Sequence, residues 1–296
     1  MVDICIVTGC ASGFGYGHVS RMISLLSLLD AGGYRVAFFS KEHPPFFPKT
    51  LRKYCVAEPC PCALLIRDLR DSTEEEILSL KKLCKDVLVI DDDGPGRALA
   101  RGFDLLPRPG RTTSTARFIY GYNFVSYIVS INAAKTPVRK EYDLYLYGVS
   151  EELSDDFTDA GISHIVPSEG KVLFCEKSRQ TLLHLNTAEA MSKSRFVLTH
   201  FGLSLFEAIA ARSFVGLINP TEYHNTLCNN LVTNYDDETI HNYGTIDTID
   251  RTLLVTRIKA LLVRLNTEFY PAEVSRYIAQ AHSQTMTDIA EIFSGV

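Results

Sequence analysis

Short apolar runs alternate with amphipathic segments through the first third of the chain. The runs are rich in β-branched residues and lie at residues 4–8, 35–40, 63–66 and 87–90. Between the first two runs, apolar residues recur at helical spacing from Val19 to Leu29, and Gly32-Gly33 then supply a stop signal. A strand-like run followed by a helical segment, repeated along the chain, predicts βαβ units and a parallel sheet.

The same alternation starts again near Tyr142, after a polar stretch. Four further apolar runs, separated by helical or loop segments, lie at residues 143–147, 171–175, 195–199 and 214–218. From Asp247 onward the pattern is wholly helical. The length of 296 residues also reaches the size at which single cores tend to split. We therefore predict two domains, residues 1–137 and 138–296, joined by a linker near Pro137.

Composition and charge narrow the class of protein. Hydrophobic residues make up 46% of the chain, enough for a sizeable core, and the formal net charge is −5. The lysines and arginines are scattered, so no basic stripe is available for nucleic acid. No apolar stretch reaches the roughly 20 residues of a membrane span, and the N-terminus lacks a signal-like cationic region. We expect a soluble, cytoplasmic protein with no nucleic-acid partner and no integral membrane segment.

The cysteines are expected to be reduced. Cys5, Cys84 and Cys175 lie inside apolar runs, which favours buried thiols over a disulfide framework. One cluster, C-V-A-E-P-C-P-C at residues 55–62, raises the question of a metal. It lacks the second matched pair typical of structural zinc, so a reduced loop cluster is the main interpretation and zinc the minor alternative.

A glycine-rich stretch follows the first predicted strand. Residues 9–21 read G-C-A-S-G-F-G-Y-G-H-V-S-R, and a helix is predicted from Val19. Glycines such as Gly15 and Gly17 let backbone amides approach an anion or a sugar, and the helix dipole points to the same place. His18 at this position suits a general base. The alternative is a glycine turn in which the histidine only shapes the loop.

Two common nucleotide-binding loops do not fit this stretch. A dinucleotide fingerprint needs an acidic residue at the end of the second strand, and here Lys41 follows residues 35–40, with Glu42 only afterwards. A P-loop needs a G-K-[ST] ending, which is missing. A nicotinamide-dependent oxidoreductase is therefore the weakest functional class.

A second strand-to-helix junction carries polar groups at residues 199–209, T-H-F-G-L-S-L-F-E-A-I. Gly202 and Ser204 could offer donors to a phosphate, and Glu207 could accept hydrogen bonds from a ribose diol. Alternatively, Ser204 starts the helix and Glu207 is a first-turn carboxylate stabilised by the helix dipole.

The next predicted strand is followed by N-P-T-E-Y-H-N, which places Glu222 and His224 in one loop. These polar groups converge on a strand end, where doubly wound domains bind ligands. A helix cap on the surface is the alternative.

Two further segments contain candidate contacts. Asp91-Asp92-Asp93 follows the run at 87–90, and carboxylates at a strand end bind cations or sugar hydroxyls, or else cap the helix that Pro95 opens. Tyr122 and Asn123, in G-Y-N-F near the linker, suit contacts with a sugar ring or packing between domains.

Taken in order, these motifs resemble the GT-B superfamily. The segments G-Y-G-H-V-S-R, V-I-D-D-D-G-P-G-R, G-Y-N-F, H-F-G-L-S-L-F-E-A and P-T-E-Y-H-N fall in the family's order, and they are most similar to the UDP-sugar hydrolases of the pseudaminic acid pathway. The resemblance implies an α/β fold, with two Rossmann-like doubly wound domains that face across a cleft.

The resemblance also implies residue roles. His18 would activate water for an inverting attack at the anomeric carbon, and Glu207 would hold the ribose of UDP. The predicted substrate-binding residues are Gly15, Gly17, Arg21, Asp91, Tyr122 and Asn123. The predicted nucleotide-binding residues are Gly148, Gly202, Ser204, Glu207, Glu222 and His224. No metal and no cofactor enter this scheme, because helix N-termini can stabilise the departing diphosphate.

The chain departs from the family pattern at two points. Tyr147-Gly148-Val149-Ser150 stands where paired glycines are usual, and Glu222-Tyr223-His224 stands where the family has E-N-Q. Because one fold serves several chemistries, two alternatives stay open. One is a glycosyltransferase that uses a UDP-sugar donor and contacts a membrane peripherally through residues 43–53, and the other is a non-catalytic nucleotide-sugar-binding protein.

Overall fold

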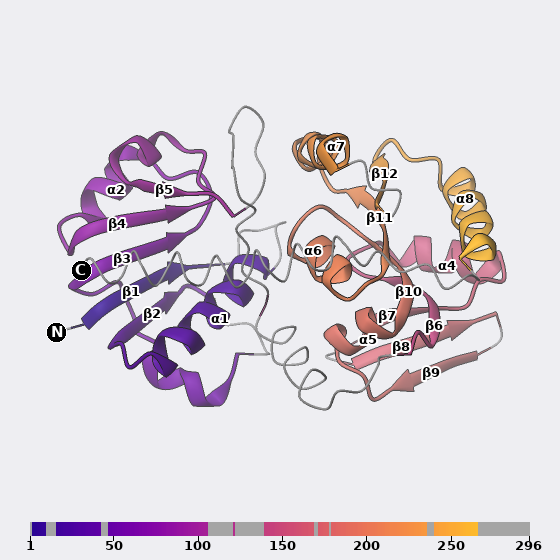
Figure 1. Cartoon of the computed structure of the whole chain (residues 1–296), viewed down its shortest axis with the longest axis horizontal. Helices are drawn as coiled ribbons and strands as arrows, with labels where there is room; N and C mark the ends of the chain where they lie inside the picture. Colours follow the sequence, from indigo (N-terminus) through magenta and orange to yellow (C-terminus); the bar gives the residue numbers. More distant parts are fainter. Residues whose placement is uncertain are drawn as a thin grey trace. The chain divides into compact units, whose positions relative to one another are not determined.

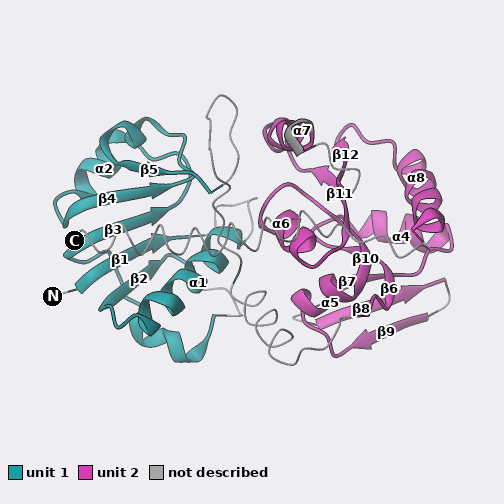
Figure 2. Cartoon of the chain, in the orientation of Figure 1, with its two compact units in different colours: residues 1–122, 281–296 teal, residues 123–280 magenta. Residues whose placement is uncertain are grey.

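The computed structural model describes residues 2–9, 16–42, 47–105, 121, 139–168, 171–177, 179–235 and 240–265. Contacts divide the described residues into two units, which Figure 2 colours separately. Unit 1 holds the described residues up to 121, and unit 2 holds those from 139 onward. The predicted boundary between residues 137 and 138 falls outside the described residues and stays a prediction.

Unit 1 is built on a parallel sheet of short buried strands (Figure 1). Its elements are β1 (Val2–Thr8), α1 (Gly17–Ala31), β2 (Val36–Ser40), the 3₁₀ helix η1 (Lys49–Tyr54), β3 (Cys62–Asp68), α2 (Glu74–Leu80), β4 (Cys84–Ile90), the 3₁₀ helix η2 (Pro95–Leu99) and β5 (Arg101–Phe103). The strand order is β2-β1-β3-β4-β5, and every pairing is parallel.

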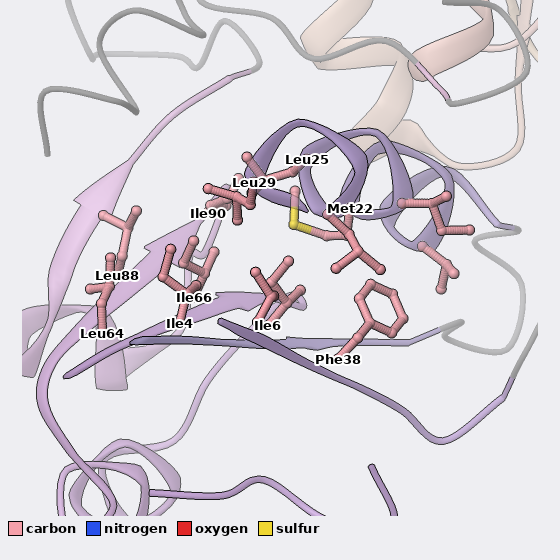
Figure 3. Packing of buried hydrophobic residues seen from close by; sticks show 14 of the residues in the cluster. Ile4, Ile6, Met22, Leu25, Leu29, Phe38, Leu64, Ile66, Leu88 and Ile90 are labelled. Carbon is pink, nitrogen blue, oxygen red and sulfur yellow. The ribbon is translucent and has the colours of Figure 1, made fainter. Parts of the chain in front are cut away.

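Both faces of this sheet are covered, as near-continuous apolar strands require. Helix α1 packs Met22, Leu25 and Leu29 on one face, in one core with Ile6, Ile66 and Ile90 of the strands (Figure 3). Helix α2 covers the other face. There it packs on the strand side chains that point away from α1. Its N-cap Thr73 accepts a hydrogen bond from the backbone N–H of Glu76, and three glutamates occupy its first turn.

Unit 2 repeats the architecture with an added hairpin (Figure 1). Its elements are β6 (Tyr142–Leu146), α4 (Glu151–Asp159), β7 (His164–Ser168), β8 (Lys171–Glu176), β9 (Arg179–Leu183), α5 (Thr187–Lys193), β10 (Ser194–Thr199), α6 (Leu203–Ala210), β11 (Phe214–Asn219), α7 (Glu222–Tyr235), β12 (Ile240–Thr245) and α8 (Arg251–Arg264). The strand order is β12-β11-β10-β6-β7-β8-β9.

Helices cover both faces of the second sheet as well. Helices α4 and α8 share one core with β6, β10 and β11. Helix α5 packs on β6 and β10, helix α6 packs on β10 and β11, and helix α7 packs on β11 and β12. The predicted fold class is therefore confirmed: the chain is α/β, with two Rossmann-like doubly wound units.

The sequence predicted one strand at the correct residues but with the wrong direction of pairing. Residues 171–175 lie in β8 as expected, but β8 pairs antiparallel with both β7 and β9. The short connection from β7 to β8 has no room for the crossover helix that a parallel pairing needs. The run therefore forms a β-hairpin at the edge of the sheet.

Each sheet has one switch point, which is the place where the chain reverses its direction of winding. In unit 1 the strands that follow β1 lie on both sides of it, so the reversal falls between β1 and β3. In unit 2 it falls between β6 and β10 for the same reason. Loops diverge at such points and leave a crevice outside the carboxyl ends of the strands, which is where doubly wound folds bind ligands.

None of the helices in the described part of the chain combines the length and the apolar character that crossing a bilayer requires.

The buried His164 makes unit 2 sensitive to acid. Its ring is fully buried, and Nδ1–H donates to the Ile162 carbonyl at 3.0 Å while Nε2 accepts from Ser154 Oγ at 2.7 Å. Burial lowers the pKa of His164 below its ordinary 6.5, although the Ile162 carbonyl and Asp155 oppose this. Below that ordinary pKa the unfolded chain binds a proton that the folded chain resists. The stability that His164 contributes at neutral pH is therefore lost as the pH falls.

We expect the urea midpoint of the wild-type protein to drop between about pH 7 and about pH 5 more steeply than that of His164→Gln. Urea unfolding followed by circular dichroism at several pH values measures both slopes. Equal slopes for the two proteins would contradict the assignment to His164.

Candidate functional site

The first candidate site lies at the switch point of unit 1, where α1 follows β1. Gly17 is the first residue of α1 and His18 the second, so His18 stands in the turn where backbone N–H groups lack partners within the helix. Arg21 lies one turn further on the same helix face. The predicted contact Gly15 falls outside the described residues.

Asp68, the last residue of β3, brings the two side chains together. His18 Nδ1 lies 2.8 Å from Asp68 Oδ1, and the Asp68 side chain is completely buried while that of His18 is 14% exposed. An ionised carboxylate only accepts hydrogen bonds, so Nδ1 must carry the proton and Nε2 the lone pair. The pair therefore fixes the tautomer in which Nε2 can act as a base.

Arg21 clamps the same carboxylate from the other side. Its Nε donates to Asp68 Oδ2 at 2.7 Å and its Nη2 to Asp68 Oδ1 at 2.5 Å, a two-point contact that only the planar guanidinium can make. The remaining nitrogen, Nη1, lies 2.7 Å from Asp91 Oδ2. Arg21 is thus shared between two carboxylates that follow neighbouring strands.

Charge compensation keeps this buried cluster ionised. Burial would raise the pKa of the Asp68 carboxyl, yet the charges of Arg21 and His18 and their hydrogen bonds hold it well below its usual range. Burial likewise opposes the charged form of Arg21, and its two carboxylate partners raise its pKa in spite of this. With a neutral His18, two carboxylates face one guanidinium.

The aspartates after β4 are held in the interior of unit 1. Asp91 is 1% exposed and sits between Arg21 and the backbone N–H of Leu105. Asp92 is fully buried and accepts hydrogen bonds from Arg67 and from the backbone N–H groups of Ser72 and Gly94. Asp92 therefore ties the loop after β4 to the loop after β3. The predicted substrate contact of Asp91 stays a prediction, as do those of Tyr122 and Asn123, which fall outside the described residues.

The second candidate site lies at the switch point of unit 2. Gly148 follows β6 with φ +71°, and Gly202 precedes α6 with φ 157° and ψ −160°, a region open essentially to glycine alone. The imidazole of His200 packs against both turns. A Cβ added at Gly148 would lie 3.0 Å from His200 Cδ2, and one added at Gly202 would lie 3.6 Å from its Nδ1.

Three groups lie at the carboxyl ends of two neighbouring strands, β6 and β10. Nδ1 of His200 contacts the carbonyl of Phe201 at 3.2 Å, a contact that places the proton on Nδ1 and leaves the other ring nitrogen beside Gly148. Helix α6 begins at Leu203, and its first-turn N–H groups point toward the same edge. This combination of glycine turns, an imidazole and a helix N-terminus suits an anionic ligand.

Ser204 and Glu207 stand on α6 in different environments. Ser204 is buried, and its hydroxyl lies 2.8 Å from that of Thr199, within the junction itself. Glu207, one turn later on α6, is half-buried. Burial, with the added charge of Glu207, raises the pKa of Tyr147 to about 12. The predicted ribose contact of Glu207 stays a prediction.

The predicted residues Glu222 and His224 open helix α7. Glu222 is exposed, and its carboxylate accepts from Asn225 Nδ2 at 3.1 Å and 3.2 Å within the same turn. His224 is buried, with Nδ1 2.7 Å from Thr221 Oγ1. The sequence placed these residues in a loop, and the structure corrects this: both lie in the first turn of α7, which follows β11, the neighbour of β10. The predicted nucleotide contacts of Glu222 and His224 stay predictions.

Sequence reasoning missed three residues of these sites. Asp68 ends the run L-L-I-R-D, His200 ends F-V-L-T-H, and Asn219 ends V-G-L-I-N. Asn219 is fully buried and accepts the backbone N–H of Phe201 at 3.0 Å, which fixes the turn before α6. All three are polar residues at the carboxyl end of a buried parallel strand, and this position is the sequence signal that pointed to them.

In the predicted membrane-contact segment, the described apolar residues Phe47 and Leu51 belong to the core. Phe47 and Leu51 are buried, and Phe47 packs edge-to-face on Phe38 at 5.4 Å between ring centroids. The basic residues Lys49, Arg52 and Lys53 of η1 are exposed. An apolar surface for lipid is therefore not formed by Phe47 or Leu51.

The cysteines of the described residues are all free thiols, with Cys62 buried and Cys55 and Cys60 partly buried. Within the same part of the chain, no three histidine, cysteine, aspartate or glutamate side chains are arranged to hold a metal ion.

Comparison with known proteins gives similarity of fold only. No model of a protein family matches the chain, and no curated protein matches its sequence. The glycosyltransferase SnogD from Streptomyces nogalater is 9% identical, with 99% of each chain covered and a TM-score of 0.49. A UDP-N-acetylglucosamine 2-epimerase is 12% identical over 94% of this chain and 90% of its own, with a TM-score of 0.44. A glycosyl transferase family 9 structure from Veillonella parvula is 10% identical over 95% and 98%, with a TM-score of 0.37. Likenesses at this level say nothing about residue roles in this chain.

Proposed function

We propose that the chain is a GT-B enzyme that hydrolyses a UDP-linked amino or deoxy sugar at the anomeric carbon and releases UDP. The observation that carries the proposal is the buried Asp68–His18 contact of 2.8 Å at the switch point of unit 1. It gives His18 a fixed tautomer, and general bases of this kind work at neutral pH.

The proposed reaction is a single inverting displacement. His18 Nε2 removes a proton from water, and the water oxygen forms a bond to the anomeric carbon. The bond from that carbon to the β-phosphate oxygen breaks, and its electron pair leaves with UDP. The imidazolium that results is stabilised by Asp68, in a cluster whose two carboxylates then balance two cations.

We assign nucleotide binding to unit 2. The first turn of α6 and His200 would receive the diphosphate, with the Gly148 turn beside them. The His200 ring nitrogen that does not contact the Phe201 carbonyl would face the phosphate. Glu207 would accept hydrogen bonds from the ribose diol, as the sequence predicts. These groups would stabilise the charge that develops on the departing diphosphate.

The charge of the unit 1 cluster favours water or a neutral acceptor. When His18 is neutral, the cluster carries two negative charges, on Asp68 and Asp91, and one positive charge, on Arg21. A further negative charge brought near the cluster, such as that of a lipid phosphate, would be repelled. The transferase alternative draws support from the exposed basic residues of η1, which could contact an anionic surface.

Release of UDP from a panel of UDP-sugars, with purified protein and no acceptor, tests the proposal. We expect UDP at catalytic rates from at least one UDP-linked amino or deoxy sugar, and the first-formed anomer seen by proton NMR should be inverted. Absence of release, with UDP still bound by calorimetry, would overturn the hydrolase and favour a transferase or a non-catalytic binder. The same panel with lipid-linked or soluble acceptors separates those two.

A further inference from the structure

The carboxylate of Asp91 stands behind Arg21, on the side away from Asp68. Arg21 Nη1 lies 2.7 Å from Asp91 Oδ2, while Nε and Nη2 hold the two oxygens of Asp68 at 2.7 Å and 2.5 Å. Asp91 comes from the loop after β4, Asp68 from the end of β3 and Arg21 from α1. The guanidinium is therefore fixed from two strands at once.

Asp91 itself is held at both ends. Its backbone adopts φ +49°, which is uncommon for a residue with a side chain and persists only where the surroundings enforce it. Its backbone N–H donates to the Phe103 carbonyl at 2.9 Å, and its Oδ1 accepts from the Leu105 N–H at 2.8 Å. With one oxygen bound to Leu105, the other faces Arg21. The turn therefore holds the Asp91 carboxylate in a fixed position.

Two donors compete for the same oxygen of Asp68. Arg21 Nη2 lies 2.5 Å and His18 Nδ1 2.8 Å from Oδ1, and the two nitrogens are 3.2 Å apart. An Arg21 with no second anion would give its whole charge to Asp68 and could rotate toward His18. Both effects would weaken the hold of Asp68 on the Nδ1–H group, because one carboxylate cannot satisfy two strong donors equally at one oxygen.

We propose that Asp91 is a positioning residue for His18: by binding Arg21, it keeps the Asp68 carboxylate in the orientation that fixes the Nδ1–H tautomer of the imidazole. The catalytic consequence rests on the proposed function, in which His18 is the general base. The tautomer itself does not depend on that function and can be measured without turnover.

Asp91→Asn tests the proposal with little change in shape. Asparagine is among the residues that best tolerate positive φ, and its amide oxygen can still accept from Leu105. Its amide NH₂ group cannot bind the Arg21 guanidinium, since both groups are donors. Asp92→Asn is the matched control, because Asp92 is the next residue and is equally buried but binds Arg67 rather than Arg21.

The readout is the pair of nitrogen-15 shifts of the His18 ring in histidine-labelled protein, assigned by comparison with His18→Gln. We expect wild type and Asp92→Asn to show the Nδ1–H form alone, and Asp91→Asn to show a mixture of both tautomers. In an active enzyme, kcat of Asp91→Asn should fall by about 10- to 100-fold with KM unchanged, by analogy with the loss found when partners that orient metal-binding histidines are replaced.

A single Nδ1–H tautomer in Asp91→Asn would overturn the proposal, and so would an equal change in both variants, which would indicate loss of structure alone. If Asp91→Asn does not fold, Arg21→Lys replaces it, because a lysine keeps the charge but cannot bridge both carboxylates. It should give the same mixture of tautomers, and a single tautomer there would equally overturn the proposal. Failure of wild type to release UDP would count against the proposed function and leave the tautomer result standing.

Discussion

Replacing Asp68 with asparagine is expected to lower the turnover of the UDP-sugar by about 10⁴-fold, the loss seen when the carboxylate behind a catalytic histidine becomes an amide. The reason is the 2.8 Å contact with His18 Nδ1. An asparagine NH₂ group would donate to Nδ1, so the ring proton would move to Nε2 and the base would be lost. Steady-state kinetics and the nitrogen-15 spectrum of His18 measure both effects.

The same variant should lose stability in a pH-dependent way. Asp68 has a lowered pKa in the folded state, so its ion pairs contribute stability at pH values above its ordinary pKa of 3.8 and lose it as the pH falls below that value. At neutral pH, Asp68→Asn should be less stable by about 3 kcal/mol, since Arg21 keeps only Asp91 as an anionic partner. The difference from wild type should shrink in acid.

The control for Asp68→Asn is Asp3→Asn, which removes a partly exposed carboxylate bound to the exposed Arg35 in the same unit. Exposed ion pairs contribute little to stability, so this variant should retain turnover and the urea midpoint of wild type. Full activity of Asp68→Asn, or a histidine spectrum identical to that of wild type, would contradict the role assigned to the carboxylate.

Replacing His18 with alanine is expected to lower turnover by about 10²- to 10⁴-fold, the usual contribution of a general base. Affinity for UDP should stay unchanged, because the proposed nucleotide contacts all lie in unit 2. Turnover assays and calorimetry with UDP measure the two quantities separately. His184→Ala, which removes an exposed histidine of unit 2, is the matched control and should behave as wild type.

The reciprocal variant separates chemistry from binding. Glu207→Ala should weaken UDP binding by about 10- to 100-fold, the effect of losing a hydrogen bond to a charged group. His18 and Asp68 are untouched by this change, so turnover at saturating substrate should be largely retained. A fully active His18→Ala protein would contradict the assignment of His18 as the general base, whatever the result for Glu207→Ala.

The proposed sites differ in how far local patterns reveal them. The sequence predicted a helix from Val19, with His18 just before it, whereas α1 begins at Gly17 and so carries both His18 and Arg21 on one face. Gly202, Ser204 and Glu207 were placed on a strand-to-helix junction for the same reason, and the structure has that junction at Thr199–Leu203. The sequence did not predict the hairpin β8–β9, because an apolar run does not reveal whether the neighbouring strand is parallel or antiparallel.

Partners distant in the sequence were beyond any local pattern. Asp68 lies 50 residues from His18, and it meets that ring because β1 and β3 are neighbours in register, with Thr8 opposite Asp68. His200 meets Gly148 because β6 and β10 pair across the switch point of unit 2. In each case the strand order decides which loops face one another, and that order follows from burying both faces of the sheet through crossover helices.

The sequence by itself determined the alternation of strands and helices, the two doubly wound units and the glycine turns at which His18 and Gly202 stand, because these follow from residue periodicity and backbone preference within a few positions. Only the tertiary structure decided which carboxylate orients His18, which side chains hold Arg21 and what lies against Gly148. Those contacts depend on strand order and register, and a buried charge such as Asp68 is stable only where the completed fold supplies its partners.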